Sequence, residues 1–338
     1  MRSYDLKMDV TGTTGLPGQL STAVTVYLPD RIDSPLAVLF GFPGGGYGRR
    51  YYDIQSLPGY SQAEHHTKQG FAFVACDHLG VGDSDQPDTF ALTYENLAAA
   101  NNAAARSVVA GLREGTLVDG MGPTEVSTVV GMGQSMGGCL LTVQQANHGT
   151  FDGVAFLGWS GTFTNFPAPD GGRIIYPMPQ RGTDLRPIAH QVLGGVGPDD
   201  SEARFCFHWP DQEPELVEAD LATFKPYTGV VRGDETTPWG SGTVPACAIT
   251  MMTDGAVAKE AAAIDVPVMV ACGERDVVPD PWAESSAFRG SSQVSLRVVP
   301  RMAHMHNFAR TRKELWDALA NFAQGVRPRQ SATADTAV

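Results

Sequence analysis

Short apolar or β-branched runs alternate along the chain with segments of helical spacing, and this alternation limits the possible folds more than any other feature of the sequence. The runs end at Pro, Gly or Asp, as strands commonly do. Strands are predicted at 22–28, 36–42, 71–76, 126–135, 153–159, 266–272 and 294–299, and helices at 61–69, 92–112, 138–148 and 311–322. Buried strands separated by amphipathic helices predict an α/β fold with a mostly parallel central sheet and helices on both faces.

The alternation stops between residues 162 and 249, where Pro, Gly and aromatic residues are frequent and no strand period is visible. A structureless loop of this length is uncommon inside a compact domain, so we expect the segment to contain helices of its own and to form an inserted cap. The core is then predicted at 1–161 and 250–325. Residues 326–338 are mostly small and polar, which predicts a flexible tail.

The composition excludes several classes of partner. The formal net charge of -13 disfavours nucleic acid and anionic membranes, because both require a basic face on the protein. No apolar run approaches membrane-spanning length, and the first residues lack the apolar region of a signal peptide. The five cysteines are far apart and show no metal-site spacing, so we expect reduced, mostly buried thiols. These features predict a cytoplasmic protein that acts on a small molecule, with homodimer formation left open.

A Gly-Gln-Ser-Met-Gly pattern at residues 133–137 lies where a predicted strand passes into a predicted helix. A serine in such a tight turn has strained backbone angles, and its neighbours two residues away must be nearly free of side chains. Gly133 and Gly137 meet this requirement. The turn would hold the hydroxyl away from the backbone, where a base can activate it. The pattern alone is common, but its position between strand and helix predicts that Ser135 is a nucleophile.

Four further motifs follow the order found in the α/β-hydrolase superfamily, and the chain resembles this superfamily over residues 22–325. The first motif is Phe-Pro-Gly-Gly-Gly-Tyr-Gly, similar to the family's His-Gly-Gly-Gly oxyanion loop. The resemblance implies that Gly45, or else Gly44, donates one N–H to the oxyanion and that the amide of Met136 donates the other. Pro43 stands where the family commonly has His, which leaves the donor in this loop open.

The second motif is Asp-His-Leu-Gly-Val-Gly-Asp-Ser at residues 77–84. It is similar to a loop that has a structural role in the family. Its glycines permit a tight path, and Asp77 is expected to bind backbone amides. The resemblance places His78 away from the nucleophile, so we expect no catalytic role for this histidine.

The third and fourth motifs supply the acid and the base. In the third, a buried strand is followed by Gly-x-x-Asp, and Asp276 matches the family's triad acid, with Glu274 and Asp280 as rivals. In the fourth, His304 follows a small residue and precedes the last helix, as the family's catalytic histidine does, whereas His306 is expected to line the pocket. A His-x-His pair can also bind metal, but no third ligand lies nearby in the sequence, so no metal is predicted.

The order Ser135, Asp276, His304 is that of the family and implies an α/β-hydrolase fold carrying a serine hydrolase of the carboxylesterase type. An acyl-enzyme would form and be hydrolysed without a cofactor. The favoured substrate is a small to medium carboxylic ester. Residues expected to contact it are Tyr47, Gln134, Trp159, Phe163, Trp209 and His306. Hydrolysis of a lactone, amide, carbamate, thioester or C–C bond stays open, as do a cofactor-free lyase or oxygenase and a non-catalytic binding protein.

Overall fold

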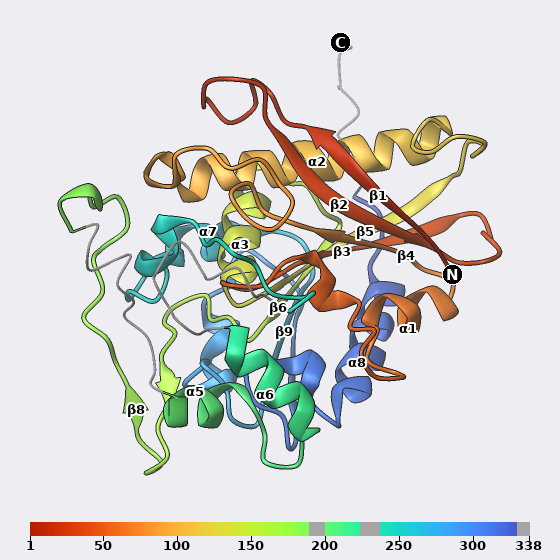
Figure 1. Ribbon diagram of the computed structural model, residues 1–338. Helices are drawn as coiled ribbons and strands as arrows, with labels where there is room; N and C mark the ends of the chain where they lie inside the picture. The colour runs from red at the N-terminus through yellow and green to blue at the C-terminus, as the bar shows by residue number, and fades with distance from the viewer. Residues whose placement is uncertain (189–199, 224–236, 330–338) are drawn as a thin grey trace.

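The computed structural model describes residues 1–188, 200–223 and 237–329. Its centre is a single eight-stranded sheet with the strand order β1-β2-β4-β3-β5-β6-β9-β10 (Figure 1). The strands are β1 (Arg2–Asp9), β2 (Ser21–Leu28), β3 (Leu36–Phe42), β4 (Ala72–Cys76), β5 (Val126–Gln134), β6 (Gly153–Leu157), β9 (Val268–Gly273) and β10 (Val294–Val299). β2 runs antiparallel to both β1 and β4, and all other pairs are parallel. The predicted mostly parallel α/β sheet is confirmed.

The edge strand β1 was not predicted from the sequence. Its side chains alternate between exposed and half-buried along Arg2–Asp9. A strand with one wet face shows this alternation rather than a continuous apolar run. β1 has neither a continuous apolar run nor the β-branched residues that marked 22–28 as a strand, so it was missed.

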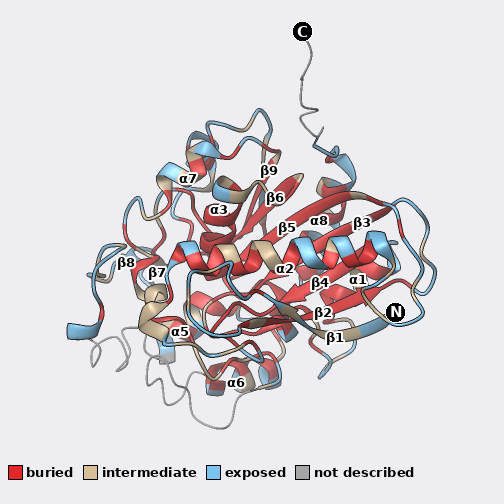
Figure 2. Cartoon of the chain, turned by 90° about the horizontal axis from the view of Figure 1, so that it is seen from above, coloured by how far each residue is buried: buried red, intermediate tan, exposed pale blue. Residues whose placement is uncertain are grey.

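Helices cover both faces of the sheet. In Figure 1, α2 lies above the sheet and α1 and α8 lie below it, and Figure 2 shows the buried side of α2 against the strands. The two layers use alternate residues of each strand: Val38 packs in one core cluster with Leu97 and Leu140, while Leu39 packs in the other with Leu315. The α-helices of the core are α1 (Gln62–Lys68), α2 (Tyr94–Glu114), α3 (Met136–His148), α7 (Ala258–Ala263) and α8 (Arg312–Gly325), and short 3-10 helices are η1 (Arg49–Tyr52), η2 (Thr89–Ala91), η5 (Pro281–Ser286) and η6 (His306–Phe308).

The segment 162–249, here called the insertion, adds no strand to the central sheet in its described part. It contains the strand pair β7 (Phe166–Pro167) and β8 (Arg173–Ile174), the helices α5 (Asp200–Phe207) and α6 (Pro214–Thr223), and the 3-10 helix η3 (Arg186–Ile188), and the 3-10 helix η4 (Ala246–Thr250) crosses its C-terminal boundary. Helices of its own were predicted, and α5 and α6 are present. Cys206, Leu216 and Leu221 from these helices join the core cluster that also contains residues of α8. The insertion thus shares a core with the lower helical layer.

Residues 326–329 of the predicted tail contact the core. The side chain of Val326 is buried, the amide of Arg329 donates to Asp152, and its guanidinium pairs with Asp265. Residues 330–338 lie outside the described residues. All five cysteines are free thiols, and four of them are buried. Among the described residues, no helix is both long enough and apolar enough to cross a membrane.

Candidate active site

Ser135 occupies the tight turn between β5 and α3. Its backbone has φ 52° and ψ −117°, a strained combination for a residue with a side chain. A Cβ at Gly133 would lie 2.4 Å from the carbonyl oxygen of Gly137, and a Cβ at Gly137 would lie 2.1 Å from that of Phe42. Only glycine fits at both positions. The predicted turn geometry is therefore present, and the neighbouring glycines make it possible.

Asp276 follows the carboxyl end of β9 and is almost fully buried. Its carboxylate accepts four hydrogen bonds. His304 Nδ1 lies 2.6 Å from Oδ1 and His306 Nε2 lies 2.7 Å from Oδ2, and the amides of Gly273 and Val277 donate at 2.8 and 2.7 Å. Burial acts to raise the pKa of this carboxyl, but the two histidines and their hydrogen bonds outweigh burial and hold the pKa well below its ordinary value. Asp276 is therefore an ionised acceptor.

The two rival carboxylates have other contacts. Glu274 accepts a hydrogen bond from the amide of Arg301, and Asp280 accepts one from the amide of Trp282 at the start of η5. Among the described residues, neither contacts a histidine. Of these three carboxylates, Asp276 is thus the one that contacts the histidines.

His304 and His306 approach Asp276 with different ring nitrogens. Because the ionised carboxylate can only accept, His304 donates from Nδ1, and its Nε2 is the acceptor of the neutral ring. His304 Nε2 lies 3.4 Å from the side-chain Nε2 of Gln134, the residue before Ser135. The acceptor nitrogen of His304 therefore lies against the side-chain amide of the residue that precedes Ser135. His306 donates from Nε2, and its Nδ1 is buried without a partner among the described residues.

The glycine loop after β3 lies against the serine turn. A Cβ at Gly44 would come within 3.2 Å of the Cβ of Ser135, and one at Gly45 within 3.9 Å of the Cβ of Met136. The amides of Gly44, Gly45 and Met136 donate to no acceptor within the described part of the chain. The structure thus brings the predicted oxyanion donors next to Ser135. It does not select between Gly44 and Gly45.

His78 supports this glycine loop from the sheet side, a position that the sequence did not reveal. The fully buried ring donates from Nε2 to the carbonyl of Pro43 at 3.1 Å and accepts at Nδ1 from the side-chain amide of Asn101 at 3.0 Å. Burial lowers the pKa of His78 to about 4, so the ring is neutral near pH 7. In a trans peptide the N–H points away from the C=O, so this bond also fixes the direction of the Gly44 amide.

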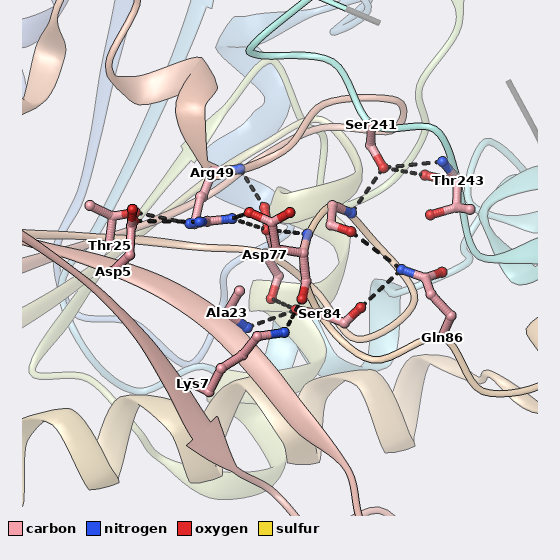
Figure 3. Close-up of polar contacts among 12 residues, drawn as sticks. Asp5, Lys7, Ala23, Thr25, Arg49, Asp77, Ser84, Gln86, Ser241 and Thr243 are labelled. Atoms are coloured by element: carbon pink, nitrogen blue, oxygen red, sulfur yellow. Dashed lines mark hydrogen bonds and ion pairs between the residues drawn. The ribbon is translucent and has the colours of Figure 1, made fainter. Parts of the chain in front are cut away.

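Asp77 anchors the chain just after the glycine loop (Figure 3). Its carboxylate accepts from the amides of Arg49 and Asp83 at 2.5 and 3.0 Å and pairs with the Arg49 guanidinium at 2.6 Å. Burial raises the pKa of Asp77 despite the nearby Arg49. A Cβ at Gly82 would lie only 2.4 Å from this carboxylate, which explains a glycine there. The expected binding of backbone amides by Asp77 is confirmed.

The insertion contacts the loops that carry the acid and the histidines. The amides of His304 and Met305 donate to the carbonyls of Cys206 and Phe207, at the end of α5, at 3.1 and 3.0 Å. On the acid side, Arg173 of β8 donates to the carbonyl of Asp276 at 2.6 Å. These loops are thus bonded through their backbones to the insertion as well as to the sheet.

The residues predicted to contact substrate have varied surroundings. Trp159 is buried against Gly138, Phe163 is half-buried, and the half-buried Trp209 stacks on the guanidinium of Arg275 at 4.7 Å. The hydroxyl of Tyr47 donates to Asp220 at 2.7 Å. The buried amide of Gln134 donates to the carbonyl of His304 at 3.2 Å. Their contact with a substrate, like that of His306, stays a prediction.

Among the described residues, no group of three or more His, Cys, Asp and Glu is arranged to hold a metal ion. No step considered below requires one. The expectation that the reaction needs neither metal nor cofactor stays a prediction.

The fold is shared by enzymes of different activity. The chain is 17% identical to a thermophilic esterase from Thermogutta terrifontis, with a TM-score of 0.63 over 96% of this chain and 100% of that one. It is 15% identical to a bromoperoxidase from Bacillus anthracis (TM-score 0.62, 95% and 100% covered) and 14% identical to a proline iminopeptidase from Mycobacterium smegmatis (TM-score 0.59, 95% and 98% covered). At such low identity these likenesses concern the fold alone.

No curated protein matches the chain in sequence. The model of the Alpha/beta hydrolase family, however, matches residues 38–318, which include the serine turn, the glycine loop, Asp276 and both histidines. This match covers most of the chain, and the sheet order and connections described above agree with it. The protein therefore belongs to the alpha/beta hydrolase family.

Proposed function

We propose that the protein is a serine hydrolase that cleaves a carboxylic ester through an acyl-enzyme intermediate. The observation that supports the proposal is the orientation of His304, whose Nδ1 donates to the ionised Asp276 and whose acceptor Nε2 lies beside Gln134, the residue before Ser135. This is the tautomer that a general base for Ser135 requires. An esterase among the structures with the same fold makes an ester the first substrate class to test.

The reaction follows from these positions. His304 Nε2 removes the hydroxyl proton of Ser135 as Oγ attacks the ester carbonyl carbon. The oxygen that becomes negative is stabilised by the amide of Met136 and one from the glycine loop. When the tetrahedral intermediate collapses, His304 returns the proton to the leaving alcohol and the acyl group stays on Ser135. Water, deprotonated by the same His304, then attacks the acyl-enzyme and releases the acid.

We also propose that the insertion is a cap that shapes the substrate pocket. Its aromatic residues would set the size of the acyl or alcohol group, since pockets of this kind are lined mainly by apolar side chains. The proposal is compatible with hydrolysis of a lactone, amide, carbamate, thioester or C–C bond, because all of these can use the same three residues.

Two measurements test the function. A fluorophosphonate should label the wild-type protein at Ser135 and leave Ser135→Ala unlabelled, and mass spectrometry of the labelled peptide identifies the site. Hydrolysis of p-nitrophenyl esters of increasing chain length, compared with lactones, amides and thioesters, then identifies the bond type. A protein that is neither labelled nor active on any of these would be a binding protein, and products that appear only with oxygen would indicate an oxygenase.

A further inference from the structure

A second buried carboxylate lies between the insertion and the glycine loop. Asp220, on α6, has no exposed surface. One of its oxygens accepts from the hydroxyl of Tyr47 at 2.7 Å and the other from the indole N–H of Trp239 at 2.8 Å. His208 Nε2 lies 3.0 Å from the carboxylate, and the other ring nitrogen contacts Gln212 at 2.8 Å. We call Tyr47, His208, Asp220 and Trp239 the Asp220 cluster.

The donors in this cluster belong to the chain segments that border the glycine loop. Tyr47 directly follows Gly46. The segment containing Trp239 runs beside the loop, since the Gly48 amide donates to the Trp239 carbonyl at 2.9 Å and the Ser241 amide donates to the Gly46 carbonyl at 3.0 Å. Asp220 therefore joins, through side chains, the same two segments that these backbone bonds pair.

A buried carboxylate is an expensive way to make a contact, because the charge loses its hydration. Apolar side chains could bury the same interface between α6 and the loop at lower cost. What the carboxylate adds is direction, since its two oxygens fix the hydroxyl of Tyr47 and the indole of Trp239 at defined points. The cluster is thus suited to fixing the positions of Tyr47 and Trp239.

The position of Tyr47 determines the conformation of the loop before it. The amide of Tyr47 closes a turn onto the carbonyl of Gly44 at 3.1 Å, and Gly46 within this turn has φ 85°. Consecutive glycines have wide conformational freedom, so their amides do not keep a direction by themselves. An oxyanion hole works only when its donors are already aligned before the reaction. Something outside the glycines must hold the turn.

We propose that Asp220 is a positioning residue for the oxyanion loop: by holding Tyr47 and Trp239 it keeps the amides of the glycine loop directed at Ser135. This inference rests on the proposed function. It makes the insertion part of the catalytic apparatus, in addition to any role in substrate choice.

The test uses Tyr47→Phe and Asp220→Asn in the full chain, with Tyr27→Phe as matched control. Tyr27 is also a buried tyrosine whose hydroxyl donates to an aspartate, Asp53, at 3.1 Å, but it lies in β2. We expect kcat on the best p-nitrophenyl ester to fall about 10- to 100-fold in both test variants, as small displacements of catalytic groups do. KM should change little, and Tyr27→Phe should keep the wild-type kcat.

A trifluoromethyl ketone gives the decisive reading, because its adduct with serine carries an oxyanion. Its inhibition constant should rise by the same factor as kcat falls, while binding of the product acid should not change. The kcat of the double variant Tyr47→Phe/Asp220→Asn should fall no further than that of the worse single variant. Both substitutions remove the same contact between Tyr47 and Asp220.

The outcomes separate the two proposals. If wild-type Ser135 is labelled and active but both test variants keep wild-type kcat and ketone inhibition, Asp220 does not position the loop. If the wild-type protein is neither labelled nor active, the proposed function itself is wrong. Should Asp220→Asn fail to fold, Tyr47→Phe, which removes a single hydroxyl group, decides alone.

Discussion

The proposed acid–base residues, Asp276 and His304, and the proposed oxyanion loop flank the serine turn but are held in different ways. Asp276 is fixed by amides of its own loop and by two histidines from one neighbouring loop. The glycine loop is held from the sheet by His78 and from the insertion by the Asp220 cluster. One half of the site thus works through side chains, and the other through backbone amides whose direction remote residues set. Removing a side chain should therefore abolish the function of the first half, whereas moving the glycine loop should impair the second.

The largest effect is expected from Ser135→Ala. The side chain is partly exposed and packs little, so the fold should remain while turnover is lost. In a related triad the loss of the nucleophile costs about 10⁶ in kcat. Steady-state kinetics and thermal unfolding of the purified variant check this. Full activity in a folded variant would contradict the assignment of Ser135 as nucleophile. The comparison between the two halves of the site would then have no basis.

The two histidines should differ sharply. His304→Ala should approach the loss seen in Ser135→Ala, because His304 Nε2 lies at Gln134, next to Ser135, whereas His306 Nε2 is bonded to Asp276. His306→Ala should mainly change KM or stability, because it removes one of four donors to Asp276. The comparison of kcat and KM in the two variants settles their roles. The reverse pattern would make His306 the base.

The pH dependence of stability should reflect Asp276. Its lowered pKa keeps the carboxyl ionised near neutral pH. Its contribution to stability is present above the unfolded pKa of about 3.9 and is lost as pH falls through the lower folded pKa. Asp276→Asn should therefore have a lower free energy of unfolding than wild type at pH 7, and the difference should become smaller in acid. Unfolding by urea at several pH values measures this difference. A stability difference that stays constant from pH 7 into acid would contradict the lowered pKa of Asp276.

A moderate effect is expected at His78. His78→Phe keeps a ring in the core but removes the donor to the Pro43 carbonyl, so kcat should fall about 10-fold through displacement of the loop. His66→Phe is the control, since His66 is equally buried and stacks on Phe73. Kinetics and melting temperatures of both variants check this. Equal losses in the two would mean that His78 matters only for stability.

The smallest effects should come from the pocket aromatics. Trp159→Ala and Trp209→Ala should shift the preferred ester length modestly, because one methylene in an apolar pocket is worth roughly 1 to 3 kcal/mol. Trp282→Ala is a control, since Trp282 is 78% exposed. Fluorophosphonate labelling of Ser135 should persist in all three. Folded variants of Trp159 or Trp209 that lose labelling would show that these residues complete the catalytic site.

The sequence predicts the side-chain half of the site better than the backbone half. Asp276 follows a strand that a continuous apolar run reveals, and His304 follows a strand whose apolar residues are interrupted by Ser295 and Arg297, but both positions could be assigned from neighbouring residues. The role of His78 could not, because its contact with Pro43 depends on how two parallel strands place their ends. Asp220 was also missed, because a charged residue on a short helix gives no sign that it is buried. β1 was missed for another reason: its side chains alternate, but it has no continuous apolar run and no β-branched residue.

The bonds from His304 and Met305 to the end of α5 link catalysis to local unfolding. These two amides are shielded from solvent only while the insertion is in place, so their hydrogen exchange reports its opening. A fluctuation that separates α5 from the core also breaks the two bonds to the loop that carries the proposed base. Opening of the insertion and displacement of His304 would then share one free-energy cost, which would limit how widely the insertion can open while His304 stays in place.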